Sequence, residues 1–377
     1  MTHVPTQGPK LDAIVLERVL SHIFKRNETL SEKGKRGTPI CIWGTHGLGK
    51  TEIVSAYAAS RGWHLAYCAP AQFEEMGDLH GLPTIHDPTP DAPHSGDEYT
   101  VFAPPDWVPK EKGPGILLLD DINRADDRIL RGLMQLLQNF EMFSWQLPEH
   151  WQIVATANPE GAEYSVTPMD DAMLTRMMHF TLGFDAKAWA KWAVAAGVDS
   201  RGINFVLNYP ETVTGKRTTP RTLAHFFEQI SDIKDLKAEI EIVALLAASC
   251  LDETTVAAFV SFVNDDLTTL IEPLDILEAK TAADWTKRFK ELAKAKGGGK
   301  RVDRMAAICT RLFLHITAEN YKSKPEHATN FAEFLLQEDI PNDLRASVLL
   351  DLTKHSSNAA KELLKDKRLA KLVLEKM

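Results

Sequence analysis

The sequence has few cysteines, and they form no metal-binding pattern. Its 377 residues include only Cys41, Cys68, Cys250 and Cys309, which are far apart and form no C-x-x-C pair. This spacing excludes a zinc-ribbon or disulfide framework and suits a reducing compartment. No apolar run approaches the length of a membrane span, and the first residues lack the basic and then apolar pattern of a secretion signal. We therefore expect a cytoplasmic protein without a membrane segment.

The sequence also lacks an excess of positive charge. It has 43 Lys and Arg against 52 Asp and Glu, a net charge of −9. We therefore expect no general attraction to nucleic acid or to an anionic membrane surface. The hydrophobic fraction of 44% is typical of a globular protein, and the length leaves room for roughly two or three domains.

What the sequence does contain is a glycine-rich loop between two patterned segments. Residues 44–51 read G-T-H-G-L-G-K-T and fit G-x-x-x-x-G-K-[ST], the phosphate-binding loop. Residues 38–43 predict a strand and residues 52–59 a helix, which is the context that this motif requires. In such a loop Lys50 reaches the β- and γ-phosphates, and the Thr51 hydroxyl ligates Mg²⁺. We therefore expect ATP to bind at Gly44, Thr45, His46, Gly47, Leu48, Gly49, Lys50 and Thr51.

Two acids follow the next strong strand signal. Residues 116–121 read I-L-L-L-D-D, and this pattern predicts a buried parallel strand that presents carboxylates at its C-terminal edge. In a protein with a phosphate-binding loop, Asp120 is expected to hold Mg²⁺ and Asp121 to orient the attacking water. Further strands are predicted at residues 151–159 and 177–182, with helices at 127–140 and 169–175. This alternation predicts an α/β fold with a parallel sheet covered on both faces.

The order of these motifs resembles that of the AAA+ ATPases, and within them the MoxR-like group. The resemblance spans residues 39–227 and includes I-V-A-T-A-N-P, M-D-D-A-M-L-T-R-M and T-P-R-T. It implies that Asn158 is the sensor 1 residue, that Arg176 is an arginine finger for the neighbouring subunit, and that Arg221 is the sensor 2 residue. Simpler interpretations remain open. Asn158 could do no more than open the turn before Pro159, and each arginine could do no more than cap helix carbonyls or form a surface ion pair.

The resemblance also implies an assembly and a task. The family forms homo-oligomers, so we expect a hexameric ring that binds ATP and Mg²⁺ and that remodels or activates a partner protein. In related systems this partner often carries a von Willebrand A domain. Two alternatives stay open, a nucleic-acid-translocating motor and a nucleotide-gated scaffold with little hydrolysis. The net charge disfavours the motor.

The sequence departs from the family at Asp121, where glutamate is usual. The carboxylate of an aspartate ends one C–C bond earlier, about 1.5 Å. A misplacement of 1 Å in an active site can cost on the order of 10²-fold in rate. Slow hydrolysis, which would favour the scaffold, and a compensating backbone are therefore both compatible with this residue.

We divide the chain into four parts, which are residues 1–37 (an N-terminal helix, with its periodic part at 11–24, and a polar connector), 38–183 (the AAA+ α/β domain), 184–293 (a helical lid) and 302–377 (a helical C-terminal module). The glycine-rich residues 294–301 form the linker before the last part. Residues 83–98 are predicted as a loop. The C-terminal helices are expected at 302–317, 328–337, 343–353 and 357–375. A small hairpin near Phe143 and Trp145 either faces a central pore or contributes to the core.

Overall fold

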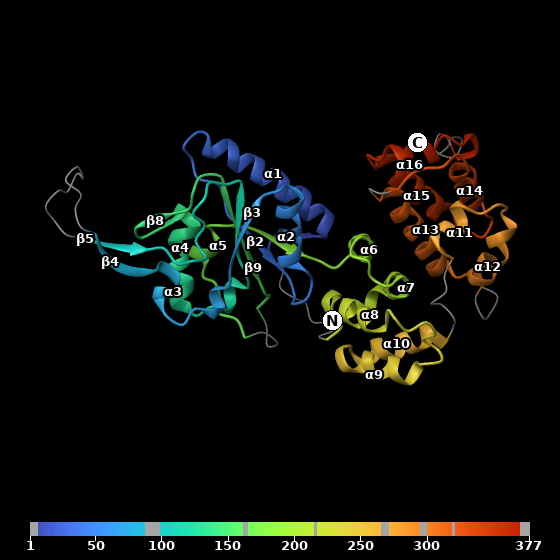
Figure 1. The fold of residues 1–377 in the computed structure, drawn as a ribbon, viewed down its shortest axis with the longest axis horizontal. Coiled ribbons are helices and arrows are strands. Elements are labelled where there is room, and N and C mark those ends of the chain that lie inside the picture. Colours follow the sequence, from blue (N-terminus) through green and yellow to red (C-terminus); the bar gives the residue numbers. More distant parts are fainter. Residues whose placement is uncertain are drawn as a thin grey trace. The chain divides into compact units, whose positions relative to one another are not determined.

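The structure is a computed structural model that describes residues 7–86, 99–160, 165–214, 217–264, 271–294, 300–318 and 321–369. The chain divides into two compact units, Met1–Phe184 and Asp185–Met377, drawn in Figure 1. Among the described residues, no helix is long and apolar enough to cross a membrane.

The first unit is built on a six-stranded sheet with the order β1-β10-β2-β9-β6-β3. All neighbouring strands in it pair parallel. The strands are β1 Lys10–Leu11, β2 Ile40–Trp43, β3 His64–Cys68, β6 Gly115–Leu119, β9 Trp151–Ala157 and β10 Met178–Leu182. This architecture confirms the predicted α/β fold. It also brings the C-terminal ends of β2, β9 and β6 together at one edge, where ligands of such sheets bind.

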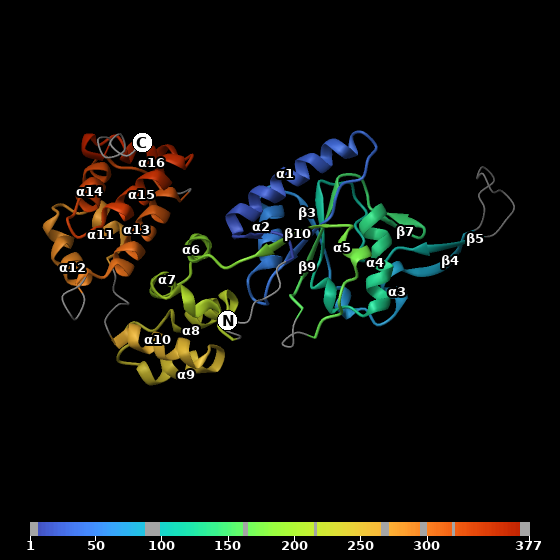
Figure 2. The ribbon, with the colours of Figure 1, turned by 180° about the vertical axis from the view of Figure 1, so that it is seen from behind.

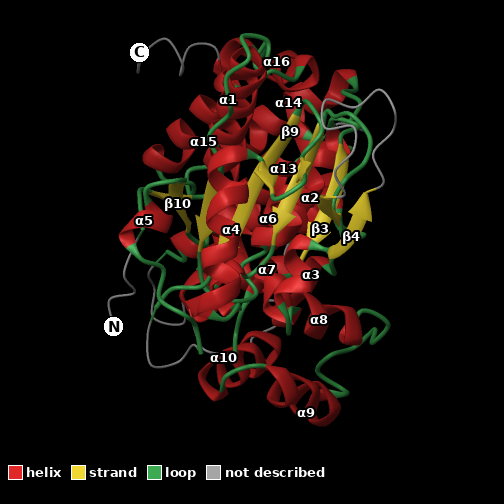
Figure 3. Cartoon of the chain, turned by 90° about the vertical axis from the view of Figure 1, so that its left-hand side faces the viewer, coloured by secondary structure: helices red, strands yellow, loops and turns green. Residues whose placement is uncertain are grey.

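Helices cover both faces of this sheet. Figures 1 and 2 show α1 (Ala13–Ser31) and α2 (Lys50–Ser60) on one side of the strands and α4 (Asp127–Asn139) on the other, and Figure 3 shows α4 crossing in front of the strands. Because side chains alternate along a strand, Leu118 packs in the cluster with α1 and α2, and Leu117 packs in the cluster with α4. Burial on both faces explains why these strands are continuous apolar runs.

Helix α1 is longer than predicted. Residues 25–31, which we expected to belong to a polar connector, continue the helix to Ser31. Asn27 accounts for the difference, because this polar residue is only 5% exposed. Its side chain accepts the Thr38 N–H at 3.0 Å and donates to the Gln152 side chain at 2.8 Å. Polar contacts thus attach the second half of the helix to the sheet, where a hydrophobic pattern would not reveal it.

Two small hairpins extend the first unit. Strand β4 (Leu82–His86) pairs antiparallel with β5 (Tyr99–Ala103), so the predicted loop is wrong for residues 83–86, while residues 87–98 lie outside the described part. Strands β7 (Glu141–Met142) and β8 (Trp145–Gln146) form the second hairpin. Trp145 is 8% exposed and its indole donates to the His80 carbonyl at 3.1 Å, so this residue belongs to the core. The remaining short elements are η1 Pro70–Gln72, α3 Met76–His80, η2 Ile122–Arg124 and α5 Asp171–Leu174.

The second unit contains only helices among the named elements of its described part. Its elements are α6 Ala186–Ala195, α7 Ser200–Asn208, η3 Pro210–Thr214, α8 Pro220–Ile230, α9 Ile240–Cys250, α10 Glu253–Asn264, α11 Pro273–Leu277, α12 Ala283–Ala293, α13 Val302–Thr317, α14 Pro325–Leu335, α15 Asn342–Lys354 and α16 Asn358–Leu363. An aromatic cluster joins α7, α8 and α10, with Phe205 and Phe226 each edge-on to Phe259. Edge-to-face pairs of this kind stabilise a core beyond the area that they bury.

A second apolar cluster runs from Ile271 to Leu369. Trp285 and Phe289 of α12, a helix that we assigned to the lid, pack edge-on against Phe334 of α14. We therefore propose that the C-terminal module begins near residue 271. Residues 295–299 of the predicted linker and residues 370–377 lie outside the described part. The single helix predicted over 357–375 is wrong, because α16 ends at Leu363 and a turn follows it.

Candidate nucleotide-binding site

The glycine-rich loop connects β2 to α2 at the C-terminal edge of the sheet. Gly47 and Gly49 have φ angles of 70° and 88°, in the left-handed region that favours glycine. Gly49 is the N-cap of α2 and supplies no side-chain cap. The N–H groups of the first helical turn are therefore left for a ligand, and the positive end of the helix dipole favours an anion there.

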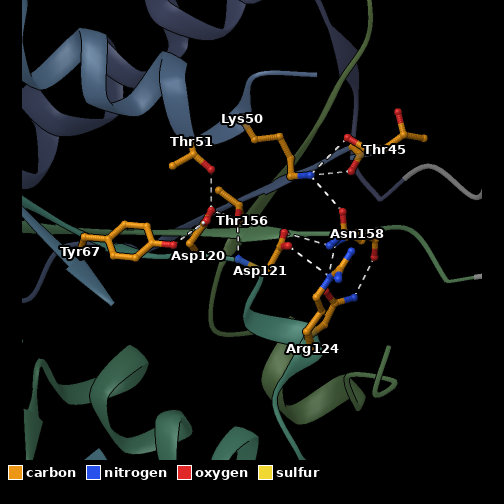
Figure 4. Close-up of polar contacts among 11 residues, drawn as sticks. Thr45, Lys50, Thr51, Tyr67, Asp120, Asp121, Arg124, Thr156 and Asn158 are labelled. Carbon is orange, nitrogen blue, oxygen red and sulfur yellow. Dashed lines mark hydrogen bonds and ion pairs between the residues drawn. The ribbon is translucent and has the colours of Figure 1, made fainter. Parts of the chain in front are cut away.

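Lys50 lies inside this loop and is only 6% exposed. Its ammonium donates to the carbonyl oxygens of Gly44 at 2.8 Å and Thr45 at 3.3 Å, and to Asn158 Oδ1 at 3.1 Å. Figure 4 shows Lys50 pointing towards Thr45 and Asn158. These three acceptors are neutral oxygens. A phosphate group carries full negative charge, so it would attract this buried ammonium more strongly than these neutral oxygens do.

Asp120 receives hydroxyl groups on both carboxylate oxygens. Thr51 Oγ1 donates to Oδ1 at 2.6 Å and Thr156 Oγ1 donates to the same atom at 2.7 Å, while the Tyr67 hydroxyl donates to Oδ2 at 3.1 Å. Partial burial and then the neighbouring Asp120 charge raise the pKa of Tyr67, so its hydroxyl stays a donor at neutral pH.

The pair of Thr51 and Asp120 fits a magnesium ion. It offers a hydroxyl and a carboxylate oxygen in direct contact, and Mg²⁺ accepts one or two protein oxygens together with phosphate and water oxygens. Among the described residues there is no cluster of three or more His, Cys, Asp and Glu side chains that could hold a metal by itself. The donor set therefore suits an ion that arrives with a nucleotide.

Asp121 has an unusual backbone and two engaged carboxylate oxygens. Its φ and ψ are 47° and 46°, a left-handed conformation outside glycine. Its N–H donates to Thr156 Oγ1 at 2.7 Å. Oδ1 accepts from Asn158 Nδ2 at 2.9 Å, and Oδ2 lies 3.2 Å from Arg124 Nε. Both the backbone and the carboxylate of this acid are thus held in one position.

Asn158 is fully buried and its backbone is fixed by a second asparagine. Its N–H donates to Asn123 Oδ1 at 3.0 Å, and Asn123 Nδ2 donates back to its carbonyl oxygen at 2.8 Å. The side chain is then free to link Lys50 on one side with Asp121 on the other. A contact chain therefore runs from the phosphate-binding loop to the second acid.

The structure brings together Lys50, Thr51, Asp120, Asp121 and Asn158. Four further residues join them that the sequence did not single out, namely Tyr67, Asn123, Arg124 and Thr156. Asn123 and Arg124 stand within the D-D-I-N-R motif itself, and Thr156 is a polar residue in an apolar strand, so a weak signal existed for these three. Tyr67 had none.

Three other expected site residues are His46, Arg176 and Arg221. His46 is an exposed residue within the glycine-rich loop. Arg176 follows α5, where its Nε donates to Gln138 Oε1 at 3.1 Å and its guanidinium also donates to the Ala172 carbonyl. Arg221 is the exposed second residue of α8 and belongs to the second unit.

Comparison with known proteins gives a match in the same region. Residues 39–177 match the family described as AAA domain (dynein-related subfamily). An ATP-dependent protease ATP-binding subunit-like protein of Rhodococcus erythropolis is 26% identical over 136 residues, 36% of this chain and 37% of the relative's length. The chain thus aligns with well under half of that relative. The RuvB Holliday junction branch migration motor of Thermotoga maritima is similar at 14% identity and a TM-score of 0.39, over 75% of this chain and 89% of that one.

Proposed function

Residues 39–177 form an AAA domain of the dynein-related subfamily, and from that premise we propose that this ATP hydrolase remodels or activates a partner protein as a MoxR-like AAA+ ATPase. The observation that carries the proposal is the contact chain from Lys50 through Asn158 to Asp121. It joins Lys50, which would bind the phosphates, to Asp121, which would orient the attacking water.

We assign each of these site residues a role in ATP hydrolysis. Lys50 would exchange its neutral acceptors for the β- and γ-phosphates, and Thr51 and Asp120 would hold Mg²⁺, which would neutralise charge on the phosphates. Asp121 orients the attacking water, and Asn158 fixes that carboxylate while it also contacts Lys50. Movement of Lys50 towards a nucleotide therefore reaches Asp121 through one side chain.

We propose that the active form is a ring, with six subunits as the expected number. Arg176 supports this, because its two acceptors, a side-chain amide and a backbone carbonyl, are neutral, and its guanidinium would gain from an anionic partner on another subunit. In that role Arg176 completes the neighbour's site. Arg221, on a helix of the lid, would contact the nucleotide as sensor 2.

A protein substrate is the partner that the observations favour. The relative from Rhodococcus erythropolis is named an ATP-dependent protease ATP-binding subunit-like protein. The net charge of −9 gives this chain no general attraction to nucleic acid. A von Willebrand A domain in the partner and work in the cytoplasm are parts of the same proposal.

Mixing two inactive variants tests the ring and the trans role of Arg176. Arg176→Ala and Lys50→Ala subunits are combined, and ATP turnover is measured after labelled protein has shown that subunits exchange. Some interfaces would then join an intact loop to an intact finger, a pairing worth roughly 10³–10⁵ in rate, so activity should return in part. Arg18→Ala, which removes an exposed arginine of α1, is the control and should be active alone. A monomeric wild type that hydrolyses ATP at full rate would contradict the ring.

A further inference from the structure

One hydroxyl contacts both acids of the site. Thr156 lies on β9 with no exposed surface, accepts the N–H of Asp121 at 2.7 Å and donates to Asp120 Oδ1 at 2.7 Å. We propose that Thr156 is a positioning residue for ATP hydrolysis that fixes the two acids relative to each other. This inference rests on the proposed function, because it assigns a further residue to the same reaction.

A threonine suits this place for chemical reasons. A hydroxyl has one proton and two lone pairs, so it can donate to a carboxylate and accept from an amide at the same time. Its β-branched side chain has few χ1 rotamers, so a single rotamer sets both contacts. The residue pairs in register with Ile42 of β2, the strand that leads directly into the phosphate-binding loop. The hydroxyl is therefore placed by the sheet itself.

Asp121 depends on this contact more than an ordinary residue would. A left-handed backbone is unfavourable for residues other than glycine, although aspartate and asparagine tolerate it best. The bond from its N–H to Thr156 holds that conformation, and the conformation directs the carboxylate towards Asn158 and Arg124. Without the hydroxyl, the N–H would be left without this acceptor and the backbone could relax. The carboxylate would then move.

Asp120 depends on Thr156 for a different reason. Its Oδ1 accepts from both Thr51 and Thr156, and the Thr51 oxygen is the one expected to turn to Mg²⁺. Thr156 is then the donor that remains on this carboxylate oxygen. Loss of its hydroxyl should therefore weaken the dependence of nucleotide affinity on Mg²⁺ as well as the rate.

Two substitutions of Thr156 separate the effect of its hydroxyl group from the effect of its side-chain shape. Thr156→Val is nearly isosteric and should lower kcat on the order of 10²-fold, the cost of a misplacement near 1 Å. Its affinity for a fluorescent ATP analogue without Mg²⁺ should stay within about threefold of wild type, because Lys50 is untouched. The gain in affinity on adding Mg²⁺ should be smaller than in wild type. Thr156→Ser, which keeps the hydroxyl, should recover most of kcat.

A matched control removes another buried strand hydroxyl. Thr181 of β10 is 7% exposed and donates to the Gln7 carbonyl at 2.9 Å, so Thr181→Val loses a comparable bond away from the acids. Its kcat should equal that of wild type even if its unfolding temperature falls. If Thr156→Val does not fold, Thr156→Ala replaces it, because alanine places no methyl group against the Asp120 carboxylate.

The outcomes distinguish this inference from the proposed function. Suppose that the wild type hydrolyses ATP. If Thr156→Val then has the same kcat as wild type, or if Thr156→Ser is as slow as Thr156→Val, the role of Thr156 is overturned and the proposed function stands. A wild type that binds ATP without hydrolysing it overturns both. The inference is supported if kcat is low for Thr156→Val, is largely recovered for Thr156→Ser, and is unchanged for Thr181→Val.

Discussion

Replacing Asp121 by glutamate tests whether the site is built for a short acid. The added methylene would carry the carboxylate about 1.5 Å further. In the structure the carboxylate oxygens lie 2.9 Å from Asn158 Nδ2 and 3.2 Å from Arg124 Nε, already inside the usual range for such contacts. A glutamate could keep both contacts only if the backbone moved, and the left-handed conformation suits aspartate better than glutamate.

We therefore expect Asp121→Glu to lower turnover, although glutamate is the family's usual residue. A displacement near 1 Å corresponds to about 10²-fold in kcat, or about 2.7 kcal/mol in the activation free energy. ATP affinity should not change, because Lys50 and Thr51 are untouched. Asp121→Asn keeps the length but removes the charge, so it should bind ATP and hydrolyse it slowly.

Steady-state ATP turnover and binding of a fluorescent nucleotide measure these two effects separately. The matched control is Asp127→Glu, which lengthens an acid on α4 whose side chain is 65% exposed, and it should behave as wild type. A glutamate variant at or above wild-type turnover would refute the reasoning. It would mean that Asn158 and Arg124 do not set the working position of the acid.

Three further predictions concern binding, packing and pH. Lys50→Ala should abolish nucleotide binding in a folded protein, and a fluorescent-nucleotide titration that shows unchanged affinity would contradict the site. Trp145→Ala should lower the free energy of unfolding by about 3–5 kcal/mol in a denaturant titration. Phe143→Ala should cost less, because Phe143 is 58% exposed and loses its contacts with the rings of His80 and Phe102. Burial lowers the pKa of His327, so below a pH of about 6.5 the unfolded chain binds the proton more readily than the folded protein does. The free energy of unfolding should therefore fall as the pH drops below this value. Unfolding temperatures of wild type and His327→Gln at several pH values measure this effect.

The parts of the fold that the sequence predicted are those with local signals. Strands β2, β6 and β9 are buried on both faces, so each is an apolar run that can be recognised without its partners. Strand β4 was missed because it carries Pro83 and begins a stretch rich in Pro, Asp and His, a composition that indicates a loop. The second half of α1 was missed because Asn27, a polar residue, makes its contact with the sheet.

The candidate site likewise contains residues that local motifs predicted and residues that they did not. Lys50, Thr51, Asp120 and Asn158 stand at positions that motif order specifies, so the chain order alone predicted that they meet. Thr156 is one polar residue in an apolar strand, and many buried threonines only satisfy a nearby carbonyl. Its partners become visible only through the register of β9 with β2 and β6. Tyr67 comes from the edge strand β3, whose place next to β6 no local pattern reveals.

Asp121 shows why side-chain length alone does not decide the activity of a site. From the sequence, a missing methylene implied a shorter reach and kept open a scaffold with little hydrolysis. In the structure, the position of the carboxylate depends on a left-handed backbone, on the Thr156 hydroxyl that binds its N–H, and on Arg124, which faces one of its oxygens. A backbone rotation moves a side-chain end by more than one bond length, so the short acid is no evidence against hydrolysis. The scaffold alternative thereby loses the observation that supported it, and we expect the activity of the site to depend instead on the left-handed backbone and on these two contacts.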